Sequence, residues 1–496
     1  MVKYIFLGSP YNSSWINITR KLYETKIAEP VIFIGHDRHY KESIKIFGDN
    51  VIEDFKIRHR PYEIYNIDYN GIYSNFFESE NYLRAKDICL KMMDRLDTYG
   101  VFNRLDREAY FHQLCILYLK KVELSQPELL ISAESPHDHC RYVIYEIARF
   151  LKIPCFKFNN WTIAPLLIFQ NLETNKLLKN SSNIDFKEYY MLIKTMIKDY
   201  IISVEDTNYE IDYMKDQRKN TGNAKIFKKK TSTNYFKDFK HNVGMFIKQK
   251  YNPINPYRLN LFTRKYIINK RKKNLLRKAK SFKDTVDVQE NYVYYPLHFE
   301  PERTTNPDAG NYHDQFKALS IIRDIIPEDF KIYVKEHPSQ LYYSEKGSRG
   351  RSPLFYQLIK NIKSIKIINS DYNSQSLIKN SKCVFTLTGT VAIESAILKK
   401  PCVTFGSTTW YSGCPNTITY SKSFDFSQIS RMEIKSSKKV YDYLIHLMKE
   451  YSIPGIMNYS QLKSFKKFDN KEFKGLQEKL LFDFFKNFFS NQIYTR

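Results

Sequence analysis

The sequence has no long hydrophobic run, no paired cysteine motif and nothing near Met1 that resembles a secretory leader. Its apolar stretches all fall short of the roughly 18 to 20 residues needed to cross a bilayer. After Met1 and Val2 comes Lys3 and then a strand-like segment, which is unlike a signal peptide. The seven cysteines include no Cys-x-x-Cys pair, which speaks against a zinc or redox motif and favours reduced thiols. We therefore expect a cytoplasmic protein, either soluble or peripheral on the inner face of the cytoplasmic membrane.

Acidic residues are scarce in one segment. The chain has 78 Lys or Arg against 53 Asp or Glu, a net charge of +25. Between residues 215 and 280 we count 21 basic residues and two acidic ones, Asp216 and Asp238, so this segment carries +19 of that charge. The rest of the chain is nearly balanced. A nucleic-acid-binding protein using residues 215–280 stays as an alternative, but it leaves most of the chain unexplained.

The remaining composition indicates a folded protein of several domains. A length of 496 residues predicts two or three domains, and 43% apolar with 16% aromatic residues excludes a wholly disordered chain. Apolar strands alternate with helical stretches before and after the basic segment, which is typical of parallel βα units. We expect an α/β fold in four parts: residues 1–204, an N-terminal Rossmann-like domain; 205–285, a basic connector; 286–430, a C-terminal Rossmann-like domain; and 431–496, C-terminal helices.

A hydroxyl-rich turn is the first candidate site. It follows the predicted strand 383–387 and contains Thr388, Gly389 and Thr390 before a helix that carries Glu394. Free backbone N–H groups at the start of a helix suit a phosphate, and Glu394 could accept hydrogen bonds from sugar hydroxyls. An ordinary βα turn with a capping threonine is the alternative.

Two further candidates follow other predicted strands of the same block. His337 and Pro338 come directly after the strand 331–334, where an imidazole could donate to a phosphate oxygen. The long polar loop after the strand 292–297 contains His298 and Glu300, with Gln315 a little further on. Such loops often line active sites, although a solvated connection would look the same.

The order of these motifs resembles bacterial capsule and surface-polysaccharide biosynthesis proteins of the GT-B glycosyltransferase kind. The resemblance covers residues 290–415, more weakly 132–151, and not the basic connector. It implies two facing Rossmann-like domains, with a nucleotide-sugar donor on the C-terminal domain and a glycan or lipid-linked acceptor on the N-terminal one. The His337-Pro338 element is also similar to that of sialyl- and Kdo-type transferases, which use CMP-sugars. The turn at 388–390 departs from the paired serines of some sialyltransferases.

An inverting transferase needs a base for the acceptor hydroxyl. The loop after the predicted strand 127–133 contains Glu134, His137 and Asp138. Asp138 is the first choice for the base, with Glu134 and His137 behind it. The alternative is that Asp138 only caps the helix that follows.

No metal or other cofactor is expected. His137, His139 and Cys140 lack a second ligand cluster, and the chain contains no Asp-x-Asp motif, which argues against the metal-dependent GT-A class. Side chains and a helix dipole would then neutralise the leaving phosphate.

The predicted function is a metal-independent, inverting glycosyltransferase that moves a sugar, such as a CMP-linked acidic sugar, onto a surface polysaccharide. The basic connector would contact the anionic membrane or an acidic glycan. Transfer of a polyol phosphate from a CDP-linked donor is a second enzymatic hypothesis, and a sugar 2-epimerase would fit the same architecture. Apolar residues at helical spacing over 473–488 predict a terminal helix that crosses back to the first domain.

Overall fold

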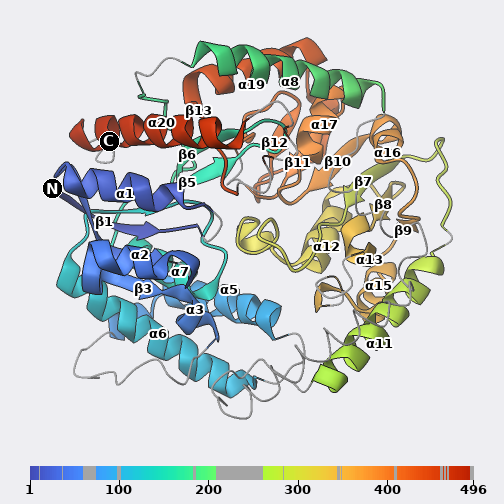
Figure 1. Ribbon diagram of the computed structural model, residues 1–496. Helices are drawn as coiled ribbons and strands as arrows, with labels where there is room; N and C mark the ends of the chain where they lie inside the picture. The colour runs from blue at the N-terminus through green and yellow to red at the C-terminus, as the bar shows by residue number, and fades with distance from the viewer. Residues whose placement is uncertain are drawn as a thin grey trace, which may run out of the picture.

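The computed structural model describes most of the chain, and Figure 1 shows how its elements are arranged. The described residues are 1–9, 12–35, 37–59, 74–97, 102–182, 186–207, 261–282, 284–342, 347, 349–406, 410–458, 462, 465 and 469–491. Most of the predicted basic connector, residues 208–260, therefore lies outside them.

The first sheet has the strand order β13-β6-β5-β4-β1-β2-β3. From β5 to β3 all neighbours are parallel, whereas β6 is antiparallel to β5 and β13 is antiparallel to β6. Parallel strands are buried on both faces, which is why β4 is a short, continuous apolar run. The strands are β1 Val2–Leu7, β2 Ala28–Gly35, β3 Val51–Glu53, β4 Leu129–Ser132, β5 Cys155–Asn160, β6 Leu166–Asn171 and β13 Ser452–Pro454.

Helices cover both faces of this sheet (Figure 1). On one side α1 packs with the C-terminal helix α20, and on the other α5, α6 and α7 pack together. The helices are α1 Ser14–Glu24, α2 Asp37–Phe47, α3 Asp54–His59, α4 Ser74–Phe77, α5 Glu80–Leu96, α6 Arg104–Ser125, α7 His139–Phe150 and α20 Asn470–Ser490.

The second sheet is parallel throughout, in the order β12-β11-β10-β7-β8-β9. Its strands are β7 Tyr292–Pro296, β8 Lys331–Lys335, β9 Ile365–Ile368, β10 Cys383–Thr386, β11 Cys402–Thr404 and β12 Thr417–Thr419. The helices are α8 Lys187–Glu205, α11 Leu261–Lys280, α12 Gln315–Ile325, α13 Pro338–Tyr342, α15 Pro353–Lys360, α16 Ser374–Asn380, α17 Val391–Ile397, α18 Ser427–Arg431 and α19 Ser437–Tyr451.

Both sheets have the doubly wound order of a Rossmann fold. In each, the first strand lies at the centre and the chain winds outward in two directions, so the order reverses beside β1 in one sheet and beside β7 in the other. The predicted α/β class with two Rossmann-like domains is confirmed. Ligands of such folds bind at the carboxyl ends of the strands, at this switch point.

Two helices cross between the predicted domains. Within α20, Leu480, Phe484 and Phe488 pack with Tyr4 and Phe6 of the first sheet. The helix α8 falls in the predicted N-terminal domain 1–204, yet its apolar face packs with α17 and α19 of the second half. The chain therefore passes between the two halves at both of these helices.

Candidate active site

The C-terminal switch point lies where three loops leave neighbouring strands. They follow β7, β8 and β10, and they carry His298, His337 and the turn at 388–390. Because adjacent parallel strands end at the same sheet edge, the structure brings these three sequence-predicted groups to one side of the second domain.

His298 holds the turn after β10 in place. Its buried ring accepts a hydrogen bond at Nε2 from the Leu387 N–H at 3.2 Å, and the Thr386 hydroxyl lies 3.0 Å from the same nitrogen. Burial lowers the pKa of His298 to about 3, with a further contribution from the charges of His337 and Arg351. The ring is therefore neutral near pH 7, with its proton on Nδ1.

Gly389 is required by the close packing of this turn. A Cβ at this position would lie 2.7 Å from the Thr386 hydroxyl oxygen, which accepts a hydrogen bond from the Gly389 N–H at 3.1 Å. Thr388 is already committed, since its hydroxyl donates to the Thr304 carbonyl at 2.6 Å. The Thr390 hydroxyl does not cap α17 and has no hydrogen-bond partner among the described residues. Of the two predicted threonine donors, it is therefore the one that could bind a ligand.

His337 points a donor away from the backbone. Its Nδ1 accepts a hydrogen bond from the Ser339 N–H at 3.2 Å, which places the proton of the neutral ring on Nε2. Burial lowers the pKa of His337 to about 4, and the charges of Lys335 and Arg351 act in the same direction. No described residue accepts from Nε2. Pro338 begins α13 directly after this histidine and so ends the preceding extended segment.

Arg351 was not predicted from the sequence, yet it joins two of these loops. Its fully buried guanidinium donates to the His298 carbonyl at 3.0 Å and pairs with Glu336 at 3.1 Å and Glu300 at 3.3 Å. Glu336 in turn accepts from the His337 N–H at 2.7 Å. The two carboxylates raise the pKa of this arginine against the effect of burial, so its charge is permanent. No short motif marks Arg351 in the sequence.

Glu300 and Gln315 support the loop after β7. The Gln315 side chain accepts from the His298 N–H at 2.8 Å and donates to a Glu300 carboxylate oxygen at 2.8 Å. Both predicted residues therefore have contacts that hold His298 in position.

Glu394 lies apart from this network, on the first turns of α17. It is 9% exposed, and burial raises the pKa of its carboxyl group to about 7, opposed by the charge of Lys335. No hydrogen bond to its carboxyl group is found among the described residues, so this group is available to a ligand.

In the N-terminal domain, the structure gives Asp138 a structural role. Its side chain caps α7 by accepting from the Arg141 N–H at 3.1 Å, and it forms a buried ion pair with the Arg141 guanidinium. Burial on its own would raise the pKa of Asp138, but the charges of Arg141 and Arg58 lower it below its ordinary value. These contacts fit the capping role that the sequence left open, and Asp138 as the base stays a prediction.

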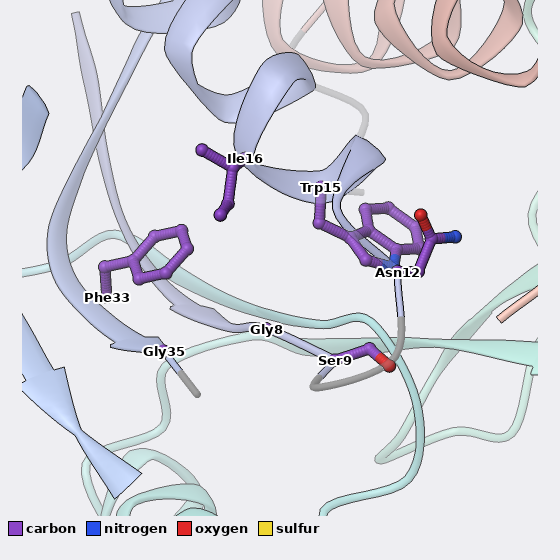
Figure 2. Close-up of a pocket in the computed structure, with 7 residues that line it drawn as sticks. All are labelled: Gly8, Ser9, Asn12, Trp15, Ile16, Phe33 and Gly35. Carbon is purple, nitrogen blue, oxygen red and sulfur yellow. The ribbon is translucent and has the colours of Figure 1, made fainter. Parts of the chain in front are cut away.

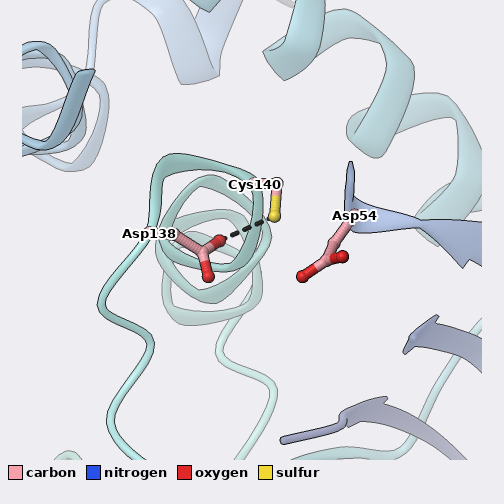
Figure 3. Close-up of side chains that lie close together, drawn as sticks. All are labelled: Asp54, Asp138 and Cys140. Atoms are coloured by element: carbon pink, nitrogen blue, oxygen red, sulfur yellow. Dashed lines mark hydrogen bonds between the residues drawn. The ribbon is translucent and has the colours of Figure 1, made fainter. Parts of the chain in front are cut away.

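Asp138 also belongs to the buried group that Figure 3 shows with Asp54 and Cys140. Three such side chains could hold a cation, but Arg141 donates to Asp54 at 2.8 Å as well as pairing with Asp138. The Cys140 thiol is protonated, because burial raises its pKa, and it donates to Asp138 at 2.6 Å. The two carboxylates are therefore neutralised by arginine, and this donor set does not fit a metal ion.

Glu134 faces the second domain. It is 8% exposed, and its Oε1 is buried without a hydrogen-bond partner among the described residues. Its Oε2 lies 3.9 Å from the His137 ring and 3.9 Å from the guanidinium of Arg303, which follows β7. The two switch points therefore meet at the pair Glu134 and Arg303.

Further contacts close the two domains around this point. Lys157, inside β5 beside Ser132 at the end of β4 and 1% exposed, donates to Ser135 at 2.8 Å and lies 3.5 Å from Asp308 of the second domain. Burial on its own would raise the pKa of Asp308, but the charges of Lys157 and Arg303 lower it. Arg95 of α5 donates to the His137 carbonyl at 3.0 Å and to carbonyls of the loop after β7.

A small cavity lies beside β1 and β2, at their carboxyl ends (Figure 2). It is lined by Gly8, Ser9, Asn12, Trp15, Ile16, Phe33 and Gly35. The Trp15 indole N–H is buried there without a partner among the described residues. No sequence motif predicted this cavity.

The fold and these two facing switch points define a GT-B-type architecture. Residues 245–456, less than half of the chain, match a family described as capsule polysaccharide biosynthesis protein. That match confirms the resemblance predicted from the sequence, and it includes every candidate residue of the second domain. None of the curated proteins matches the sequence.

Several solved structures share slight similarity with the chain. A beta Kdo 2,7 transferase, KpsC of Thermosulfurimonas dismutans, is 11% identical over 65% of this chain and 78% of its own, with a TM-score of 0.26. A UDP-GlcNAc 2-epimerase of Methanocaldococcus jannaschii is 13% identical over 90% and 99%, with a TM-score of 0.24. A glycosyltransferase of Rickettsia africae is 10% identical over 100% and 98%, with a TM-score of 0.20. At such TM-scores these similarities support no function.

Proposed function

We propose that this protein is a glycosyltransferase that moves a sugar from a nucleotide-sugar donor to a growing capsular or other surface polysaccharide. The meeting of Glu134 and Arg303 carries the proposal, because it places an unpaired carboxylate oxygen of one domain beside the predicted donor-binding loops of the other. The family match over residues 245–456 supports capsule synthesis as the setting.

In the proposed inverting reaction, Glu134 is the base. The acceptor hydroxyl attacks the anomeric carbon of the donor sugar, its proton passes to the Glu134 carboxylate, and the bond from that carbon to the phosphate oxygen breaks. His137, with its ring 3.9 Å from Glu134, is close enough to orient it. Asp138 would contribute by fixing the N-terminus of α7 and hence the loop that carries Glu134.

His337 would stabilise the leaving phosphate. Its low pKa keeps the ring neutral, and the proton on Nε2 can be donated to a phosphate oxygen. The loops at this edge of the sheet would be held in position by His298, Glu300, Gln315 and Arg351. Gly389 would leave space for the donor phosphate, and Thr390 would offer it a hydroxyl group. Glu394 would bind sugar hydroxyls. Charge is then neutralised by protein groups, so we propose a reaction without a metal ion.

We propose a CMP-linked acidic sugar as the donor, on the likeness of the His337-Pro338 element. Transfer of a polyol phosphate from a CDP-linked donor is the second candidate, because it would use the same phosphate-binding groups of the protein. Phosphodiester linkages in the product would identify it. We also propose peripheral attachment to an anionic membrane, where lipid-linked acceptors lie, because residues 215–280 carry +19 in charge. No helix in the described part of the chain is long and apolar enough to span a membrane.

Nucleotide binding and transfer test the proposal together. Saturating CMP should raise the melting temperature of the full chain above the effect of CDP, UDP or GDP, since a ligand of the native state stabilises it. His337→Ala should weaken this stabilisation and lower transfer about a hundredfold, whereas His337→Gln, which keeps a donor, should recover part of both.

His446→Ala, on α19, is the matched control and should change neither quantity. If no nucleotide stabilises the protein, or if His337→Ala transfers sugar at the wild-type rate, the proposed donor site is wrong.

A further inference from the structure

The helix α11 is strongly basic and lies at the edge of the second domain (Figure 1). Its twenty residues include nine Lys or Arg and no Asp or Glu. Leu275 is buried in the domain core, and the helix touches α13 and α15. The helix is therefore part of the folded domain, fixed by its apolar residues.

Three cations of α11 share one exposed face. Lys270, Lys273 and Arg277 are exposed and follow at spacings of three and four residues, which aligns them along the helix. None of the three forms an ion pair with a described carboxylate. Their charges are thus available to an anionic partner.

The neighbouring helix α15 adds two exposed leucines. Leu354 is 58% and Leu358 43% exposed, and they are one helical turn apart on the same face. The opposite face of α15 joins the segment after α11: the ring centroids of Tyr356 and Phe282 lie 4.9 Å apart, and Lys360 pairs with Asp284 at 3.2 Å. Basic and apolar groups therefore lie on adjoining helices.

This combination selects one partner. Charge alone would suit a nucleic acid, an acidic glycan or an anionic membrane equally. Two exposed leucines beside the cations favour the membrane, where apolar side chains enter the acyl boundary while cations remain at the headgroups.

We propose that α11 and α15 form a docking surface for an anionic lipid bilayer, with Lys270, Lys273 and Arg277 at the headgroups and Leu354 and Leu358 inserted. This docking surface specifies which residues would attach the protein to the membrane. It rests on the proposed function only for the reason why the protein would be attached there. Because α13 begins directly after His337 and touches α11, docking would bring the donor side of the enzyme to the membrane.

Flotation of the full chain with vesicles tests this surface without any donor or acceptor. The wild-type protein should bind vesicles of phosphatidylcholine with 30% phosphatidylglycerol, a composition chosen to be anionic, and not pure phosphatidylcholine. Lys270→Glu, Lys273→Glu and Arg277→Glu together should lower binding at least about a hundredfold. Leu354→Ser with Leu358→Ser should lower it about tenfold or more at unchanged charge.

Matched substitutions elsewhere serve as controls. Lys194→Glu, Lys198→Glu and Lys438→Glu change the net charge equally on α8 and α19, and Leu83→Ser with Leu105→Ser changes two exposed leucines of the first domain. These controls should float like the wild type, and every variant should keep the wild-type melting temperature.

Three results would overturn the docking surface: flotation unchanged by the α11 substitutions, flotation unchanged by the α15 substitutions, or equal loss with the controls. If only the α11 substitutions reduce flotation, and the leucine variant still binds heparin or DNA, the surface is a polyanion-binding site instead. Sugar transfer is measured separately, so a protein that floats without transferring sugar would contradict the proposed function and leave the docking surface standing.

Discussion

The two sheets share one strand order, and ion pairs hold the loops at both switch points, but the chemical groups that these loops present differ. Around Glu134 the N-terminal loop is fixed by ion pairs, of Asp138 with Arg141 and of Lys157 with Asp308. In the C-terminal domain, His298 and His337 each accept a backbone N–H at one ring nitrogen and are neutral near pH 7.

This difference matches the two halves of the proposed chemistry. A proton acceptor needs a carboxylate that stays charged, whereas a neutral imidazole offers a hydrogen-bond donor to a leaving phosphate over a wide pH range. Equivalent edges of the same fold are thus suited to opposite proton-transfer roles. Three changes would break or sharpen this contrast.

The largest effect is expected within the N-terminal loop, where two carboxylates lie four residues apart. Glu134→Gln should lower the turnover number about a thousandfold with donor affinity unchanged, because the amide cannot take the proton. Asp138→Asn should instead lower the free energy of unfolding by about 3 kcal/mol, since it leaves Arg141 with one fewer buried partner. Steady-state kinetics and urea denaturation of both variants measure the two effects.

The reverse pattern would restore the original prediction. If Asp138→Asn, compared per folded molecule, loses more turnover than Glu134→Gln, then Asp138 is the base and its pairing with Arg141 must open during the reaction.

Sequence patterns predicted the architecture better than the site. Apolar runs of strand length followed by polar loops were enough to place both sheets, because parallel strands must be buried. The sequence could not separate the roles of Asp138, since a capping aspartate and a catalytic one follow a strand in the same way. It also missed Arg351 and Lys157, whose partners are brought together only by folding, and β13, a three-residue strand that pairs with β6 from far along the chain.

The next effect concerns the contact between the domains. Asp308→Asn should lower the free energy of unfolding by about 3 kcal/mol, because it leaves the buried Lys157 ammonium without a carboxylate. The double variant Lys157→Met with Asp308→Asn should recover most of this loss. Chemical denaturation measures both, and Glu328→Gln, in an exposed pair with Lys363, is a control that should cost less than about 0.5 kcal/mol. Equal small losses in all variants would mean that the pair does not hold the domains together.

The smallest effect tests the neutral character of the C-terminal site at Glu394. Its pKa rises from an ordinary 4.5 to about 7 in the folded protein, chiefly through burial. The native state therefore favours the protonated carboxyl group. Below pH 4.5 this group does not lower the free energy of unfolding, and it lowers that free energy increasingly as pH rises through 7. Glu394→Gln should stabilise the protein by about 2 kcal/mol at pH 8 and leave it unchanged at pH 4.5. Urea denaturation at the two pH values measures the difference, with the exposed Glu433→Gln as the control. If Glu394→Gln is more stable at pH 8 but binds the donor more weakly, Glu394 serves its ligand at the expense of stability. If its stability at pH 8 is unchanged, the carboxyl group is solvated and is not part of a neutral site.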